Sequence, residues 1–102
     1  MKAYIAGKIT GDPDYKKKFE DGKKRLEEMG HTVLSPAELP LGMSNGDYMR
    51  ICFAMIDVAD IVAFLPGWQE SRGAKLENEY CQYISKQTFY LEYAKKGEEI
   101  DA

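Results

Sequence analysis

An alternation of short apolar runs with amphipathic segments is the feature that most constrains the fold of this chain. Residues Ile61–Leu65 form an unbroken apolar run, which is typical of a parallel strand that is buried on both faces. Segments with helical spacing stand before and after this run, and the same alternation extends through the chain. The pattern therefore predicts an α/β domain with a parallel sheet and helices on both faces.

The predicted elements follow one another in the order β-α-β-α-β-α-β. The strand-like segments are Lys2–Ala6, Thr32–Leu34, Ile61–Leu65 and Thr88–Tyr93. The helix-like segments are Tyr15–Met29, a segment from an N-cap at Asp47 to Ala59, and Ala74–Ile84. We expect a small three-layer, flavodoxin- or Rossmann-like fold with a parallel sheet of about four strands. The 102 residues suffice for one domain over residues 1–94, followed by a polar tail over residues 95–102.

Composition and charge limit the kinds of molecule that the chain can bind and the cellular compartment in which we expect it. The net charge of -3 and the lack of a basic stripe argue against binding to a nucleic-acid polymer. No segment resembles a secretory signal or has the length of a transmembrane helix, so we expect a cytoplasmic protein that does not enter membranes. The one histidine and two cysteines lack the spacing of a metal site, and we expect neither a metal nor a cofactor.

The size of the domain bears on its assembly. A domain of this length is only marginally stable alone, because it buries a small share of its surface. The predicted second and third helices carry wide apolar stripes and extra apolar residues such as Phe53 and Tyr83. We therefore expect a homo-oligomer.

Two loops follow strands at the edge of the sheet where open α/β folds bind ligands, namely Gly7–Pro13 and Pro66–Gly73. In the first loop, Gly7 permits a close backbone approach, Lys8 adds a positive charge and Thr10 adds a hydroxyl. This loop is either the wall of a phosphate or sugar site or a plain β-to-α turn.

The second loop leads into a helix that carries an unusual carboxylate. Ser71 is placed to cap this helix. Helical spacing predicts a buried stripe made of Gly73, Glu77, Tyr80, Cys81 and Ile84. A carboxylate is costly to bury without a partner, so Glu77 is either part of a capping box or salt bridge or a reactive group at the mouth of a pocket.

Several blocks of the sequence resemble one family. The segment Tyr4–Gly11 resembles the opening Tyr-Ile-Ala-Gly-Pro-Met-Thr-Gly of the DUF4406 family, whose members are similar to nucleoside 2-deoxyribosyltransferases. Asn45–Asp60, the Pro-Gly-Trp of Phe64–Trp68 and the Ser-x-Gly-Ala-x-x-Glu of Ser71–Glu77 match the rest of its pattern. The resemblance covers about residues 2–92.

The resemblance implies cleavage of an N-glycosidic bond, or transfer of a deoxyribosyl group, on a small-molecule nucleoside or nucleotide. In the related enzymes a helix carboxylate attacks the anomeric carbon, and that residue is Glu77 here. The serine that holds the 5′ end of the substrate corresponds to Ser71, and the tyrosine that lines the sugar site corresponds to Tyr4. Trp68 either stacks on the base or sugar or covers the end of the sheet. The substrate-binding residues that we expect are Tyr4, Gly7, Lys8, Ile9, Thr10, Trp68, Ser71 and Gly73.

One position departs from the pattern of the related enzymes. The aspartate that protonates their leaving base falls on Cys52, which lies on the apolar stripe of its own helix. Asp57 and Asp60 are near in sequence, but neither replaces that acid, because Asp57 points away from the stripe and Asp60 ends the helix. The alternative to an enzyme is therefore a non-catalytic nucleotide-binding or sensing module that has lost the acid; a small scaffold protein is a third possibility.

Overall fold

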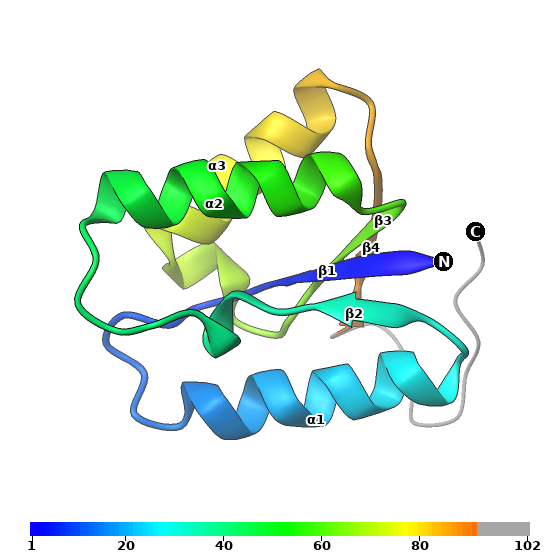
Figure 1. Ribbon diagram of the computed structural model, residues 1–102, viewed down its shortest axis with the longest axis horizontal. Helices are drawn as coiled ribbons and strands as arrows, with labels where there is room; N and C mark the ends of the chain where they lie inside the picture. Colours follow the sequence, from blue (N-terminus) through cyan, green and yellow to red (C-terminus); the bar gives the residue numbers. More distant parts are fainter. Residues whose placement is uncertain (92–102) are drawn as a thin grey trace.

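Four parallel strands form the central sheet of the computed structural model, which describes residues 1–91 (Figure 1). The strands lie in the order β2-β1-β3-β4. Their bounds are Lys2–Ala6 for β1, Thr32–Leu34 for β2, Ile61–Phe64 for β3 and Gln87–Tyr90 for β4. Tyr4 in the middle of β1 pairs with Leu34 on one side and Val62 on the other. The predicted fold class, a small parallel α/β sheet, is confirmed.

The two central strands are apolar throughout their buried length. All four residues of β3 and the last four residues of β1 are fully buried, and helices cover both faces of these strands. Burial on both faces is the reason that the run after Asp60 contains no polar residue. The edge strands β2 and β4 are only partly buried, and their sequences contain polar residues.

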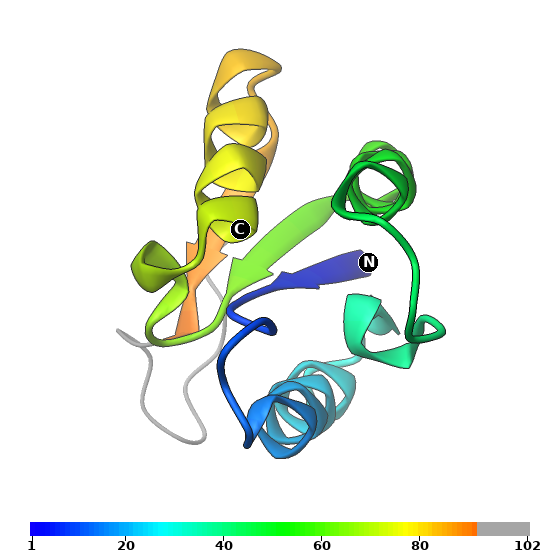
Figure 2. The ribbon, with the colours of Figure 1, turned by 90° about the vertical axis from the view of Figure 1, so that its left-hand side faces the viewer.

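Helices cover the two faces of the sheet unequally (Figure 2). Helix α1 (Tyr15–Glu28) packs on one face through Phe19 and Leu26. Helices α2 (Asn45–Val58) and α3 (Arg72–Tyr83) pack on the opposite face. The longest helices within residues 1–91 have 14 residues, and none is long and apolar enough to cross a membrane.

The connections place a topological switch point between β1 and β3. The chain leaves β1 for α1 on one face and leaves β3 for α3 on the other face, while β1 and β3 are neighbours in the sheet. The two loops at the carboxyl ends of these strands therefore diverge (Figure 2). Crevices that bind ligands in open α/β sheets form at such points.

Some predicted bounds were wrong by a few residues. The N-cap of α2 is Ser44 rather than Asp47, because the Ser44 Oγ accepts the backbone N–H of Asp47 at 3.1 Å. Helix α3 begins at Arg72, two residues before the predicted start, and β4 ends at Tyr90. The predicted tail over residues 95–102 lies outside the described residues.

The buried stripe of α3 also differs from the prediction. The buried residues of this helix are Ala74, Glu77 and Cys81, whereas Ile84 is 39% exposed. Ile84 is the C-cap residue, where the backbone leaves the helix, so helical spacing no longer determines its direction. Glu77 remains at the centre of the stripe, as predicted.

Candidate functional site

A single carboxylate lies inside the apolar layer between the sheet and α3. Glu77 is in the second turn of α3, and only 4% of its surface is exposed. The apolar residues Ala74 and Cys81 stand on the same face of the helix, one turn before and one turn after it. This spacing holds the Glu77 side chain over the sheet, so the carboxylate is removed from water by the fold itself.

The phenol of Tyr4 is the hydrogen-bond partner of this carboxylate. Its O–H donates to Glu77 Oε2 at 2.9 Å, and both side chains are buried. Tyr4 occupies the middle of β1, where its side chain faces α2 and α3. The bond joins residues 73 positions apart in the chain, so it depends on the packing of α3 on β1.

Cys52 of α2 lies beside the same pair. Its side chain is 4% exposed and belongs to the apolar cluster that contains Tyr4. The thiol interacts with the Tyr4 phenol and with the Glu77 carboxylate. The polar groups gathered at this point are thus one carboxylate, one phenol and two thiols, the second being the buried Cys81 of α3.

Burial determines the protonation behaviour of this group. Burial raises the pKa of Glu77 to about 7, and hydrogen bonding from Tyr4 and Cys52 lowers it in part. Burial likewise raises the pKa of the Tyr4 phenol well above its ordinary value and raises the pKa of the Cys52 thiol to about 11. Among residues 1–91 no lysine or arginine forms a salt bridge with Glu77. The salt-bridge interpretation of Glu77 is therefore wrong for the part of the chain that the structure describes.

Contacts between α2 and α3 fix the position of Cys52 relative to Glu77. The rings of Phe53 and Tyr80 stack with centroids 4.4 Å apart and planes 5° apart. The Tyr80 O–H donates to Asp57 at 2.7 Å. Phe53 follows Cys52 directly, and Tyr80 lies one turn after Glu77. These two contacts between the helices therefore keep the Cys52 thiol close to the Glu77 carboxylate.

The first loop packs largely on the other side of the sheet. A Cβ atom added at Gly7 would lie 3.0 Å from Leu65 Cδ1 and 3.2 Å from Phe19 Cζ, so packing on the α1 side leaves little room for a side chain here. Ile9 also packs against the apolar cluster under α1. Lys8 is half-buried and Thr10 is exposed. The structure therefore supports the plain-turn interpretation for Gly7 and Ile9 and leaves Lys8 and Thr10 accessible at the edge of the sheet.

Ser71 and Gly73 shape the start of α3. The Ser71 Oγ accepts the backbone N–H of Ala74 at 3.1 Å, which is the predicted N-cap. A Cβ atom added at Gly73 would lie 3.2 Å from Met49 Cε, so the glycine allows α2 to approach the start of α3 closely. Both residues stand one to two turns before Glu77 on the same helix.

Trp68 covers the carboxyl end of the sheet. Its ring lies 5.0 Å from the ring of Phe64 and 5.7 Å from the ring of Tyr90, measured between centroids. Phe64 and Tyr90 are the last residues of β3 and β4. The indole is half-buried, and its Nε1 has no hydrogen-bond partner within residues 1–91. The predicted covering role is present in the structure, and the partly open ring leaves the stacking role as a proposal.

Comparison with known proteins agrees with the fold and the motifs. The model of the family described as "Domain of unknown function (DUF4406)" matches residues 1–90. The chain belongs to the DUF4406 family. No curated protein matches it.

The fold of this DUF4406 chain is similar to a solved structure of a 2-deoxyribosyltransferase from the psychrotolerant bacterium Bacillus psychrosaccharolyticus. The TM-score is 0.69 at 21% sequence identity, and the alignment covers 99% of this chain and 77% of the other. At this identity the likeness establishes a shared fold.

The sequence alone did not identify Tyr90 as a residue of the candidate site in this DUF4406 chain. Tyr90, at the end of β4, takes part in the aromatic group with Trp68, and its phenol oxygen accepts a hydrogen bond from Asn78 at 2.8 Å. Its position at the carboxyl end of a strand is the signal that could have identified it. Among residues 1–91 no group of three histidine, cysteine or acidic side chains could hold a metal ion.

Proposed function

We propose that this chain cleaves or transfers the N-glycosidic bond of a nucleoside or nucleotide, with Glu77 as the nucleophile. The observation that carries the proposal is the Glu77 carboxylate, which is 4% exposed and hydrogen-bonded to the Tyr4 phenol at 2.9 Å. A carboxylate buried in this way destabilises the fold and is more readily explained by chemistry than by structure.

The position of this carboxylate supports the proposal. Tyr4 belongs to β1, which with β3 flanks the topological switch point, and Glu77 of α3 bonds to it. The fold is shared with a 2-deoxyribosyltransferase. Family membership adds the motifs around Tyr4 and Glu77, and we extend the sugar chemistry of that enzyme to this chain as part of the proposal.

In the proposed reaction a carboxylate oxygen of Glu77 bonds to the anomeric carbon while the bond from that carbon to the base nitrogen breaks. The bonding pair leaves with the base, and a glycosyl ester remains on Glu77. Water then releases the free sugar, or a second base takes the glycosyl group. The Tyr4 O–H orients one carboxylate oxygen, which leaves the other oxygen to attack.

The substrate is proposed to bind at the carboxyl edge of the sheet, next to the loops that begin α1 and α3. Lys8 and Thr10 are accessible polar residues of the first loop, and Asp12 of the same loop is paired with Lys18. The amides at the start of α3, capped by Ser71, are a suitable site for an anionic 5′ group. The partly open ring of Trp68 is suited to stacking against the base or sugar.

The test is an incubation of the purified protein with nucleosides, 5′-nucleotides and their charged-base analogues, in which free base is followed by chromatography. Base release should fall by several powers of ten in Glu77→Gln, because the amide cannot attack carbon. Glu79→Gln on the exposed side of the same helix is the matched control and should release base at the parent rate. A Glu77→Gln variant with the parent rate would exclude Glu77 as the nucleophile.

A binding or sensing module is the second candidate, favoured by the thiol of Cys52 beside Glu77. Such a module would bind nucleotides from the panel, and binding would be detected by calorimetry or by a rise in melting temperature, without release of base. This outcome would replace the enzymatic proposal.

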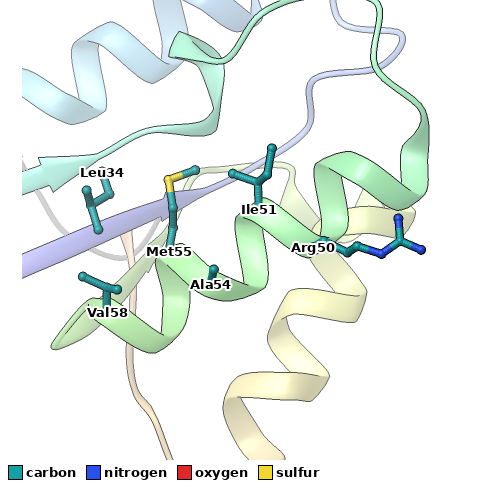
Figure 3. A pocket seen from close by; sticks show the side chains of 6 residues that line it. All are labelled: Leu34, Arg50, Ile51, Ala54, Met55 and Val58. Atoms are coloured by element: carbon teal, nitrogen blue, oxygen red, sulfur yellow. The ribbon is translucent and has the colours of Figure 1, made fainter.

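We also propose that a second copy of the chain packs on the outer face of α2. Ile51, Ala54, Met55 and Val58 recur at helical spacing and, with Leu34 and Arg50, line an open hollow of about 410 Å³ (Figure 3). Val58 is 57% exposed. Antiparallel packing about Ala54 would bring Arg50, one turn before Ala54, toward Asp57 in the last turn of the partner helix. The small side chain of Ala54 allows the two helices to approach closely, and the charges of Arg50 and Asp57 are opposite. Both features suit a symmetric dimer in which each chain uses the same surface.

A further inference from the structure

The site contains one carboxylate and no second acid within the described chain. Of residues 1–91, Glu77 is the only buried carboxylate. The side chains that interact with it are the phenol of Tyr4 and the thiols of Cys52 and Cys81. A side chain that protonates a leaving group works best when it loses its proton near the working pH. Phenols and thiols in an apolar interior hold their protons too tightly for that role.

The other acids and the histidine that flank this region have different positions or partners. Asp57 accepts the Tyr80 O–H at 2.7 Å, and Asp60 accepts the backbone N–H of Lys2 at 2.8 Å. Lys2 begins β1, and His31 directly precedes β2, so Asp60 and His31 lie at the amino edge of the sheet, opposite the loops. Glu70, next to Ser71, is exposed and lies outside the buried group, and Asp12 of the first loop forms a salt bridge with Lys18 at 2.8 Å.

This arrangement constrains the leaving group. When the glycosidic bond breaks, the bonding pair goes to the base, so a neutral base leaves as an anion unless an acid protonates it. A positioned acid contributes about 10²–10⁴-fold to such a step. A base that already carries a positive charge leaves as a neutral molecule and needs no acid.

Building on the proposed function of Glu77, we propose that the substrates are N-glycosides with a cationic leaving group, such as pyridinium nucleosides and nucleotides or purine nucleosides alkylated at N7. A Glu77 oxygen bonds to C1′ as the C1′–N bond breaks, and the bonding pair neutralises the ring nitrogen. Water then opens the glycosyl ester, which restores the carboxylate and releases one proton to solvent.

Two further features of the site match a cationic ring. The Glu77 carboxylate has no cationic partner among residues 1–91, and a cationic base beside it would supply the missing positive charge. The half-buried ring of Trp68 lies with Phe64 and Tyr90 at the carboxyl ends of β3 and β4. Electron-rich ring faces attract cations, most strongly when the ring is an indole.

The experiment compares matched substrates that differ only in charge. N7-methylguanosine is paired with guanosine, the corresponding 2′-deoxynucleosides form a second pair, and nicotinamide riboside is the pyridinium probe. After the rate in buffer is subtracted, the wild-type protein should cleave the cationic member of a pair at least about 100-fold faster. Glu77→Gln should abolish the difference.

The outcomes separate this inference from the function on which it rests. Equal, Glu77-dependent rates on both members of a pair would overturn the inference and leave the proposed function intact. Cleavage of neither member, nor of nicotinamide riboside, would overturn both. With the pyridinium probe, the rate should rise as the pH passes about 7 and then stay level to pH ~9, because no acid has to remain protonated. A fall on the alkaline side below pH ~9 would reveal a second acid and contradict the inference.

Replacement of Cys52 provides an independent test. Cys52→Asp places a second carboxylate beside Glu77 and should raise cleavage of the neutral member of a pair, so that the preference for the cationic member falls at least about tenfold. Cys52→Ser adds no acid and should retain the parent preference. A folded Cys52→Asp protein, verified by its thermal melt, with an unchanged preference would contradict the inference.

Discussion

At the scale of single residues, the site is defined by a conflict between stability and ionisation at Glu77. The carboxylate lies in an apolar layer, and within residues 1–91 it accepts a hydrogen bond from the Tyr4 phenol and forms no salt bridge with a cation. Burial therefore favours the protonated form, which explains why the pKa of Glu77 is raised to about 7. At neutral pH both forms of the carboxyl are populated, which suits a nucleophile that must be ionised to react.

The stability of Glu77→Gln should depend on pH in a defined direction. A carboxyl with a higher pKa in the folded chain binds its proton more tightly when folded, so its contribution to stability falls as the pH rises from about 4.5 to about 7. Glutamine is neutral throughout. The variant should therefore match the parent at pH ~4 and be more stable by about 3 kcal/mol at pH ~8, as measured by denaturant unfolding. Lower stability than the parent at pH ~8 would mean that a cation compensates Glu77.

Removal of the Tyr4 hydroxyl should shift the titration of Glu77. The Tyr4 O–H stabilises the ionised carboxylate, so Tyr4→Phe should raise the pKa of Glu77 above about 7. NMR titration of the Glu77 carboxyl carbon measures this change. Tyr48→Phe removes a phenol that bonds to the Pro40 carbonyl at 2.6 Å and should leave the titration unchanged. An unaltered pKa of Glu77 in Tyr4→Phe would show that the phenol does not control it.

At the scale of elements, α3 combines the cap, the close helix contact and the carboxylate in two turns. Ser71 caps the helix, Gly73 lets α2 approach, and Glu77 lies on the buried face one turn after Ala74. The stacked rings of Phe53 and Tyr80 then fix α2 against α3. The geometry of the site therefore depends on one helix and its attachment to a neighbour.

Ser71 can be tested for a second role beyond capping. Ser71→Ala removes the acceptor for the Ala74 N–H and should lower stability by about 1 kcal/mol, or the melting temperature by roughly 4–8 °C. Ser71→Asp keeps a capping oxygen and should recover most of this loss. Base release that stays low in Ser71→Asp despite recovered stability would assign the hydroxyl to the substrate. If Ser71→Asp recovers both the stability and the rate of base release, Ser71 acts only as the helix cap.

At the scale of the whole molecule, the two faces of the sheet differ in the side chains that they bury. The α1 face encloses an apolar cluster in which Glu77, Tyr4 and Cys52 take no part. The opposite face holds these three residues and, on the outer surface of α2, the open apolar hollow. In a small soluble domain, an apolar surface of this kind marks a site where a partner or a ligand binds.

The proposed pairing of two copies predicts the effect of a charge on the outer face of α2. Wild-type protein should sediment as a dimer or larger assembly at tens of micromolar, roughly the level at which weak dimers associate. Val58→Glu should shift it to the monomer, because two carboxylates would be buried near each other. Leu41→Glu, also at an exposed apolar residue but outside the hollow, should not. A monomeric wild-type protein would exclude the pairing.

Local pattern was sufficient to predict the fold and part of the site. The apolar run at Ile61–Leu65 predicted a central strand, and the spacing around Glu77 predicted a buried carboxylate; the structure has both. These predictions succeed because periodicity records which face of an element is buried. The bounds were less accurate, as at Ser44, since hydrogen bonds to the cap decide where a helix begins.

The sequence by itself determined the order of the elements, the parallel sheet and the placement of a carboxylate on an apolar stripe, because each follows from residues close together in the chain. Only the tertiary structure decided which groups meet that carboxylate. Tyr4, Cys52 and Glu77 belong to three elements, and their contact arises when α2 and α3 pack on β1. Likewise, the close contact of Gly7 with Leu65 and Phe19 arises from packing in the folded chain. Contacts between distant residues follow from packing, which no local spacing records.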